Sequence, residues 1–330
     1  MVREWDPGTA PAAEVAAVLR AMNEIVTIDV PEDPLWRMDM FREYLAVTMP
    51  GERRSSWLAL ADGEVIGHAS LLALEEIGVL EVSVVPAARN GDTETALLAA
   101  VARRAAEEGF ESVGVEVVGA TPSVEFFESH GFSCAFIEMR NMLNLGEVDW
   151  LRLGEMAAGI SAGYRLEYHP DGPPETHLPA YADAKEAARA GVVNDLELRP
   201  SSYDADRLRA SLATLRARGL KPYIVLAVHE ASQTIAGLTE VVVPAQRPTR
   251  ADQYDTVVVP AHRGYGIGRA LKARMLFELR AAEPGLVDVQ TWNATENEPM
   301  VKVNAELGFK PDREWREYEA DVVDLLRRLK

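Results

Sequence analysis

The chain of 330 residues is long for one domain, and at about 150 residues per domain it has room for two hydrophobic cores. Hydrophobic residues make up 48% and charged residues 26%, which is ordinary for a globular protein, and no apolar run reaches the roughly 20 residues that cross a bilayer. The formal net charge of −18 disfavours nucleic acid and anionic membrane surfaces as partners, because phosphate would be repelled, and suits a cationic ligand such as an amine.

The start of the chain and its cysteine content favour a cytoplasmic protein. Charged residues and prolines follow the first Met at once, so the sequence predicts no signal peptide. The single cysteine, Cys134, has no internal disulfide partner and lies in the apolar run GFSCAFIEM, which predicts a buried thiol in a reducing compartment. The six histidines show no spacing typical of metal ligands, and we expect no metal site.

In chain order, the first half alternates helical and strand patterns. A helical stretch leads into an antiparallel hairpin, a third strand and a helix, and a further strand, a short helix and a closing strand follow. These segments are residues 10–25, Ser55–Leu72 with a glycine at Gly67, the strand ending at Pro86, the helix after it, SVGVEVV, the helix ending at Gly131, and CAFIEMRNML.

The second half repeats this order, which indicates an internal duplication. Arg89 recurs as Arg263, 174 positions later, and Gly131 recurs as Gly308, 177 positions later. The matching segments are residues 203–219, Lys221–Val243 with Gly237, the strand ending at Pro260, a helix with Leu271, Met275, Leu276 and Leu279 at helical spacing, LVDVQTW, the helix ending at Gly308, and EWREYEADV. Helices combined with a largely antiparallel sheet predict a mixed α/β (α+β) fold, with domains at 1–147 and 148–330.

Residues 168–193 have no visible counterpart in the first half. The segment is rich in proline and turn-forming residues. We expect a loop-helix insertion or a plain linker here, with a lid over the substrate as a third alternative.

The second copy carries a glycine-rich loop between a strand and a helix, Arg263-Gly264-Tyr265-Gly266-Ile267-Gly268. Glycines allow the backbone to approach a ligand closely, and the first turn of a helix offers unpaired N–H groups at its positive end, so the loop favours a phosphate or pyrophosphate. A P-loop would end in Gly-Lys-Ser/Thr, but Arg269 and Ala270 follow Gly268. A dinucleotide-binding loop would need a third glycine where Arg269 stands, inside a parallel βαβ series.

The remaining match is Arg-x-x-Gly-x-Gly, and it resembles the pyrophosphate loop of the GNAT acyl-CoA-dependent N-acetyltransferases. The resemblance extends over about residues 222–322 and includes the strand TVVVPAHRGYGIGRAL and the segment NEPMVKVNAELGFKP. The arrangement also resembles tandem GNAT proteins of the mycothiol synthase type, in which one half carries the active site. It implies two tandem GNAT domains, with acetyl-CoA as the cosubstrate.

The resemblance also implies roles for particular residues. Main-chain groups of Val257 and Val259 should hold the pantetheine arm, and those from Arg263 to Gly268 should hold the pyrophosphate, with Asn297 near the cofactor arm. These cofactor-binding candidates are Val257, Val258, Val259, Arg263, Gly264, Tyr265, Gly266, Ile267, Gly268, Arg269, Asn293 and Asn297. Glu240 stands on the preceding strand, where related enzymes often place the base that deprotonates the amine, although a solvated strand carboxylate is the alternative. Asn304 replaces the tyrosine that commonly protonates the leaving thiolate, and an amide cannot supply a proton.

The first copy departs from the motif at these positions. Asp92 and Glu94 stand where the second copy has Gly266 and Gly268. Acids suit the positive end of a helix, but they would displace a pyrophosphate. We therefore expect the first domain to be degenerate, serving as scaffold or as part of the substrate cleft.

These observations predict an acetyl-CoA-dependent N-acetyltransferase for the primary amine of a small molecule. A non-catalytic acyl-CoA-binding protein and a protein N-acetyltransferase are the alternatives. No nucleic-acid or membrane partner is expected. A fused duplicate predicts either a monomer that is an internal pseudo-dimer or a homodimer.

Overall fold

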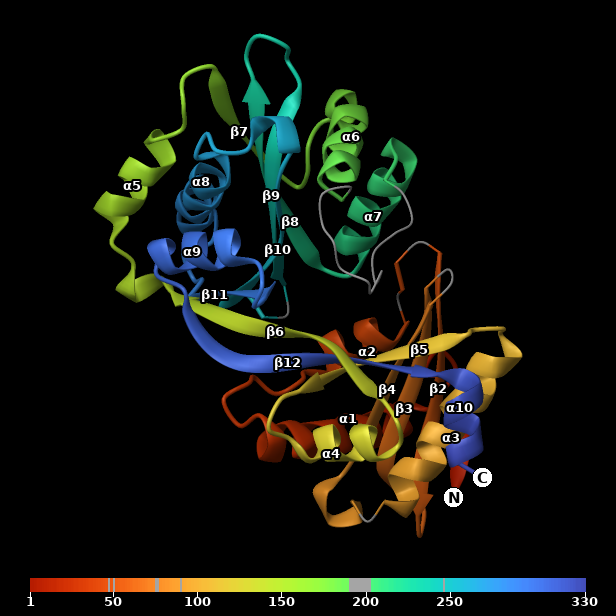
Figure 1. Cartoon of the computed structure of the whole chain (residues 1–330). Coiled ribbons are helices and arrows are strands. Elements are labelled where there is room, and N and C mark those ends of the chain that lie inside the picture. Colours follow the sequence, from red (N-terminus) through yellow and green to blue (C-terminus); the bar gives the residue numbers. More distant parts are fainter. Residues whose placement is uncertain (47, 50, 75–76, 90, 190–202, 246) are drawn as a thin grey trace. The chain divides into compact units, whose positions relative to one another are not determined.

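The computed structural model describes residues 1–46, 48–49, 51–74, 77–89, 91–189, 203–245 and 247–330. The chain forms two compact units. Unit 1 comprises Met1–Ile137 with Glu314–Lys330, and unit 2 comprises Glu138–Arg313. The colours of Figure 1 show that unit 1 combines the beginning of the chain, in red to yellow, with its blue C-terminal end.

Unit 1 is a mixed sheet with helices on both faces. Its strands lie in the order β1-β2-β3-β4-β5-β12, antiparallel except for the parallel pair β4–β5. The elements are β1 (Val2–Trp5), α1 (Ala12–Asp29), α2 (Met38–Ala46), β2 (Glu52–Ala61), β3 (Glu64–Leu74), β4 (Ile77–Val84), η1 (Pro86–Ala88), α3 (Asp92–Glu107), β5 (Ser112–Val118), α4 (Pro122–Ser129), β12 (Lys310–Asp321, from Glu314 in this unit) and α10 (Val322–Arg328).

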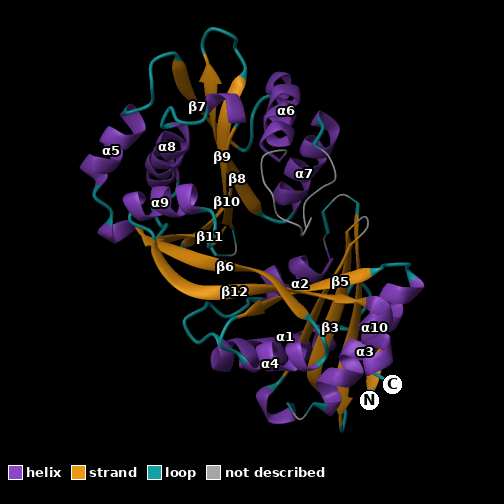
Figure 2. Cartoon of the chain, in the orientation of Figure 1, coloured by secondary structure: helices purple, strands orange, loops and turns teal. Residues whose placement is uncertain are grey.

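Unit 2 repeats the same plan, with strand order β6-β11-β10-β9-β8-β7 and one parallel pair, β10–β11. Figure 2 shows helices on either side of this sheet. The elements are β6 (Ser133–Asn144, from Glu138 in this unit), η2 (Leu145–Glu147), α5 (Trp150–Ala158), β7 (Tyr164–Pro170), η3 (Glu175–His177), α6 (Leu178–Arg189), α7 (Ala205–Ala217), β8 (Leu220–His229), β9 (Ile235–Pro244), β10 (Arg250–Val258), η4 (Pro260–His262), α8 (Ile267–Ala282), β11 (Asp288–Ala294) and α9 (Glu298–Leu307).

The predicted mixed α/β fold class is confirmed. The sequence of β8 shows why helices cover both faces of the sheet in unit 2. Side chains alternate along a strand. Tyr223, Val225 and Ala227 pack with α8, and Ile224 and Leu226 pack with α6 and α7. An apolar run of this kind fits a sheet that is buried on both sides. In the described part of the chain, no helix is long and apolar enough to span a membrane.

The expectation that each copy is closed by its own last strand was wrong. β12, at the end of the second copy, pairs with β5 over Trp315–Asp321, and β6, at the end of the first copy, pairs with β11 over Glu138–Asn144. The exchange is fixed by apolar burial, since Tyr318 lies in the core of unit 1 and Leu143 in that of unit 2. The predicted boundary at 147/148 thus separates the two copies in the sequence. In the structure, β12 of the second copy completes the sheet of unit 1, and β6 of the first copy completes the sheet of unit 2.

Residues 168–189 do have counterparts in the first copy, so both the insertion and the plain linker expected there were wrong. The segment contains the end of β7 and all of α6, and these two elements occupy the places that β1 and α1 hold in unit 1. Residues 190–193 lie outside the described part. The equivalence is one of position, because β7 and α6 share little sequence with β1 and α1.

Cys134 is exposed, which overturns the prediction of a buried thiol. It lies in the first residues of β6, where the side chains of residues 133–135 are all exposed. The apolar run around it enters the core only further along the strand.

One glycine in each unit allows a helix to pack tightly onto the sheet. At Gly237 a Cβ atom would lie 2.8 Å from the carbonyl oxygen of Val257 and 3.1 Å from Cγ2 of Ile267. At Gly67 it would lie 3.0 Å from Leu97 Cδ1 and 3.1 Å from the Ser83 carbonyl oxygen. The same close approach in both units supports the alignment of the two copies, in which Gly67 corresponds to Gly237.

Gly237→Ala should lower the free energy of unfolding by about 1–3 kcal/mol, because the added methyl meets a backbone oxygen that cannot rotate away. Gly285→Ala is the matched control, since its Cβ would meet no atom within 4 Å. Urea unfolding of the three proteins measures the difference. Equal stability of Gly237→Ala and the wild type would contradict the packing described.

Candidate cofactor and acceptor site

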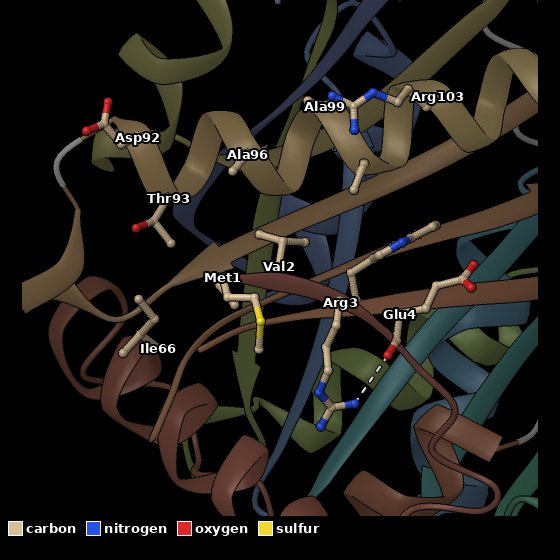
Figure 3. Close-up of a pocket in the computed structure, with 13 residues that line it drawn as sticks. Met1, Val2, Arg3, Glu4, Ile66, Asp92, Thr93, Ala96, Ala99 and Arg103 are labelled. Carbon is tan, nitrogen blue, oxygen red and sulfur yellow. Dashed lines mark hydrogen bonds between the residues drawn. The ribbon is translucent and has the colours of Figure 1, made fainter. Parts of the chain in front are cut away.

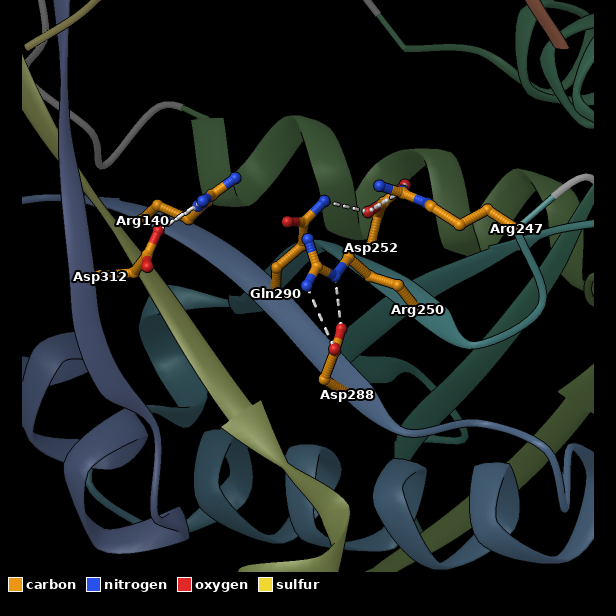
Figure 4. Close-up of polar contacts among 7 residues, drawn as sticks. All are labelled: Arg140, Arg247, Arg250, Asp252, Asp288, Gln290 and Asp312. Atoms are coloured by element: carbon orange, nitrogen blue, oxygen red, sulfur yellow. Dashed lines mark hydrogen bonds and ion pairs between the residues drawn. The ribbon is translucent and has the colours of Figure 1, made fainter. Parts of the chain in front are cut away.

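Strands β10 and β11 run parallel but pair over only three rungs. The last of these rungs joins Asp252 to Gln290, after which both strands continue unpaired with each other. Their closed end is held by side chains across the same rungs: Arg250 contacts Asp288 at 2.5 and 3.2 Å, and the Gln290 amide donates to Asp252 at 2.6 Å. Figure 4 shows these contacts together with Arg247–Asp252 and Arg140–Asp312. The result is a V-shaped opening at the carboxyl ends of the two strands.

The edge of β10 that faces this opening is set by its ladder with β9. The N–H of Val259 donates to the Ala236 carbonyl at 2.9 Å, so Val259 and Val257 direct their main-chain groups to β9. Because main-chain groups alternate in direction along a strand, the N–H and C=O of Val258 point to the other edge of β10, away from β9. Its carbonyl accepts a hydrogen bond from Arg263 Nε at 3.2 Å. The prediction that the main chain of Val257 and Val259 holds the pantetheine was therefore wrong, and among the candidate valines it is Val258 whose main chain faces away from β9.

The glycine loop joins β10 to α8 at the wide end of the V. Gly264 and Gly266 have φ of +86° and +75°, a region that favours glycine, and a Cβ at Gly264 would meet nothing within 4 Å. No side chain caps the N-terminus of α8 within the described residues. Ile267 is buried beneath the loop, whereas Gly268 is half-exposed. The loop therefore leaves space beside main-chain N–H groups, as an anion site requires.

The charged and aromatic side chains of the loop are accessible. Arg263 is exposed, and Arg269 is 40% exposed and pairs with Glu306 at 3.3 Å. Tyr265 is half-exposed and lies against Tyr164, whose hydroxyl bonds to a ring nitrogen of His262. Two arginines thus flank an open loop at the positive end of a helix.

Unit 1 has the same backbone plan with its charges already neutralised. The Glu94 carboxylate accepts a hydrogen bond from the Gly91 N–H at 2.9 Å, at the start of α3. Arg89 repeats the bond of Arg263 by donating to the Val84 carbonyl at 3.0 Å, but its guanidinium also holds Asp29 at 2.6 and 2.8 Å. The groups that would bind an anion in unit 1 are therefore bound to carboxylates of the chain itself.

A cavity of about 560 Å³ in unit 1 lies away from its β4–β5 pair. Figure 3 shows its lining from β1, β3 and one face of α3, including Arg3, Ile66, Asp92, Ala96 and Arg103. In unit 2 the corresponding face of α8 is covered by α5, where Trp150 packs on Phe277. The cavity of unit 1 is therefore not at the position that corresponds to the V-shaped opening of unit 2, where the glycine-rich loop lies.

Glu240 lies in a polar cluster beneath α6 and beside β10. Lys185 donates to both of its oxygens at 2.8 and 3.0 Å, and the Tyr181 hydroxyl also donates to it. Lys185 contacts Asp255 at 2.8 Å as well, next to an irregularity in the β9–β10 ladder between Gln253 and Thr256. The predicted base is thus one of two carboxylates that share an ammonium group.

Burial and the neighbouring Asp255 carboxylate raise the pKa of Glu240 well above its ordinary value. The Lys185 ammonium acts in the opposite direction, because it favours the charged form. A carboxylate whose pKa is raised toward neutrality is a more effective proton acceptor than an ordinary one.

The predicted asparagines have different surroundings. Asn297 begins α9 as its cap and accepts from the Met300 N–H at 3.4 Å. Asn304 is 2% exposed, and its amide bonds both Lys272 and Asn293, at 2.6 and 2.5 Å. Asn304 is therefore a buried connector between α8, α9 and the end of β11.

Sequence reasoning missed Lys185, Tyr181 and Asp255 near Glu240, and Lys272 near Asn304. Lys272 had a signal, since a lysine stands among apolar residues on the inward face of the helix. Lys185 and Tyr181 had none, because their segment was assigned to an insertion.

Comparisons with known proteins bear on the fold of the chain. Residues 18–132 match the model of the acetyltransferase (GNAT) family. The search of curated proteins found no match. Among solved structures, the chain is similar to a tandem GNAT protein from the clavulanic acid biosynthesis pathway, with a TM-score of 0.81, 24% identity and 98% of each chain covered.

Two further structures share the fold at lower identity. A GCN5-related N-acetyltransferase from Sphaerobacter thermophilus has a TM-score of 0.71 and 16% identity, over 98% of this chain and 95% of that one. A glucosamine N-acetyltransferase region of a fungal multi-domain β-N-acetylglucosaminidase has a TM-score of 0.71 and 12% identity, over 97% and 38%.

The chain thus has the tandem GNAT fold, as the sequence predicted. The match to the acetyltransferase (GNAT) family over residues 18–132 supports acyl-CoA-dependent acetyl transfer as a class of chemistry. The match falls on the first copy, whereas the open glycine loop lies in the second.

Glu240→Gln should become more stable relative to the wild type as the pH rises between about 5 and 8. A raised carboxyl pKa means that the native state retains a proton that the unfolded state has released, so rising pH destabilises the wild type alone. If the pKa of a group is higher by 1 in the native than in the unfolded state, the free energy of unfolding changes by about 1.4 kcal/mol over the full titration. Urea unfolding across this range measures the difference, with Glu230→Gln controlling for loss of one surface charge. Parallel stability curves for wild type and Glu240→Gln would contradict the raised pKa.

Proposed function

We propose that the chain is an acetyl-CoA-dependent N-acetyltransferase that acts on the primary amine of a small molecule and binds its cosubstrate in unit 2. The observation that carries the proposal is the parting of β10 and β11 beyond Asp252 and Gln290, with an open glycine loop at the wide end. When bound, acetyl-CoA supplies an activated acetyl thioester.

The residues around the opening fit such a group. The main-chain N–H groups from Arg263 to Gly268 would hold the pyrophosphate, with Arg263 and Arg269 supplying charge. The main chain of Val258 and the side chain of Asn293 would contact the pantetheine arm. The positive-φ glycines support this fit, because a side chain at Gly264 would fill the space beside the N–H groups.

Glu240 would take the proton from the acceptor amine. An amine is protonated at neutral pH, so its lone pair becomes available only after a base removes a proton. Glu240 and Asp255 together already bind one cation, the ammonium group of Lys185. The same two carboxylates would also attract a cationic acceptor. The net negative charge of the chain favours such an acceptor as well.

Unit 1 would serve as scaffold. The support for this role is that Glu94 and Asp29 occupy its anion-binding groups. The cytoplasm is the proposed location, because the single cysteine of the chain has no internal disulfide partner.

Release of free CoA thiol from acetyl-CoA, measured with a panel of amines, tests the proposed activity. The panel should contain alkyl amines, amino acids and amino sugars, the last because one structure with this fold is a glucosamine N-acetyltransferase region. With an accepted amine, Glu240→Gln should lower kcat by about 10²–10⁴-fold with little change in acetyl-CoA affinity. Glu230→Gln, an exposed carboxylate of the same unit, should leave the rate unchanged.

Acetyl-CoA binding without turnover of any amine would favour the alternative of a non-catalytic acyl-CoA-binding protein. Turnover of peptides but of no small amine would favour a protein acetyltransferase. An unchanged kcat in Glu240→Gln would remove Glu240 from the role of base.

A further inference from the structure

A buried chain of three polar side chains crosses the core of unit 2. Lys272 on α8 donates to Oδ1 of Asn304 at 2.6 Å, and Nδ2 of Asn304 donates to Oδ1 of Asn293 at 2.5 Å. Lys272 and Asn304 are 1% and 2% exposed, whereas Asn293 is half-buried near the end of β11. These three hydrogen-bonded side chains therefore lead from the interior of the core to the end of β11, where this strand no longer pairs with β10.

The charge of Lys272 is costly at this position. Among the described residues, its contacts are the Asn304 amide and the ring of Phe309, 5.1 Å from Nζ, with no carboxylate. Burial lowers the pKa of Lys272 to about 7. A buried ammonium without a counter-ion is stabilised only by the oxygen dipoles that it contacts, so it orients and polarises the amide beside it.

The duplication shows that folding does not need these polar groups. In unit 1 the position of Lys272 is Leu98 and that of Asn304 is Phe127, by the offsets of the two repeats. The register of β5 and β11 against their closing strands gives Val117 as the counterpart of Asn293. All three side chains of unit 1 are buried in one apolar core. The same fold therefore accepts an apolar set at these positions, and the polar set occurs in the unit with the open glycine loop.

The hydrogen-bond directions fix which end of Asn293 is available. Its Oδ1 accepts from Asn304, so its Nδ2 donor is the group left for another partner. Asn293 lies three residues beyond Gln290, the last residue of β11 that pairs with β10. A donor polarised by a cation through a second amide is stronger than an ordinary amide N–H.

We propose that Lys272 and Asn304 are positioning residues that orient and polarise Asn293, so that its amide N–H binds the carbonyl oxygen of the acyl thioester. The assignment rests on the proposed acetyl-CoA site of unit 2. In it, Asn304 does not replace a tyrosine as a proton donor but transmits the charge of Lys272 to Asn293.

Infrared spectroscopy of acetyl-CoA labelled with carbon-13 at the acetyl carbonyl, bound to the full chain, tests this assignment without an acceptor amine. The carbonyl stretch should lie at lower frequency in the wild-type complex than in free acetyl-CoA. Asn293→Ala should abolish this shift and Lys272→Met should reduce it, and the double variant should resemble Asn293→Ala. Additive effects of the two substitutions would contradict an action of Lys272 through Asn293.

Two further measurements separate this role from a structural one. Calorimetry should give acetyl-CoA affinities for the single variants within about tenfold of the wild type, since a single hydrogen bond changes. Urea unfolding of Lys272→Met should show stability equal to or above that of the wild type, because an apolar side chain replaces a buried charge. A carbonyl band unchanged by either single substitution, with binding retained, overturns this assignment alone. Absence of acetyl-CoA binding to the wild type overturns the proposed function and this assignment together.

Discussion

The candidate site of unit 2 depends on one constraint, the short pairing of β10 with β11. Two parallel strands that part after the Asp252–Gln290 rung expose main-chain groups along their inner edges, and exposed groups require a partner. The ion pair of Arg250 with Asp288 and the bond of Gln290 to Asp252 hold the closed end, so the opening is built into the sheet. The loop, the start of α8 and the amide of Asn293 are all arranged around its wide end.

The duplicated unit acts as an internal comparison. β4 and β5 also pair over three rungs, so both units form the same opening, and what differs is charge. In unit 1, Glu94 and Asp29 neutralise the groups that remain open in unit 2, and apolar side chains replace the buried chain from Lys272. Unit 1 uses these positions for stability, while unit 2 leaves a helix N-terminus open and buries a cation, as functional sites often do at a cost in stability.

The sequence predicts much of this structure, for identifiable reasons. The repeated order of hairpin, arginine turn and Leu-Gly-Phe or His-Gly-Phe segment predicts both the duplication and the mixed fold, because local patterns determine these elements. The exchange of β6 and β12 was not predictable, since a strand of suitable pattern fits the edge of either copy. The surroundings of Glu240 were missed for a related reason: Lys185 and Tyr181 reach it from a helix far away in the sequence, and only the folded chain brings them together.

The most direct test of the central claim is acetyl-CoA titration calorimetry of the wild type and of a variant carrying Gly266→Asp and Gly268→Glu, which gives unit 2 the acids of unit 1. We expect one site in the wild type and none in the variant, because the new carboxylates would occupy the N–H groups of the loop as Glu94 does at the start of α3. Asp92→Gly with Glu94→Gly is the reciprocal control for unit 1. Two sites in the wild type, or one that survives in the variant, would mean that unit 2 is not the single cofactor-binding half.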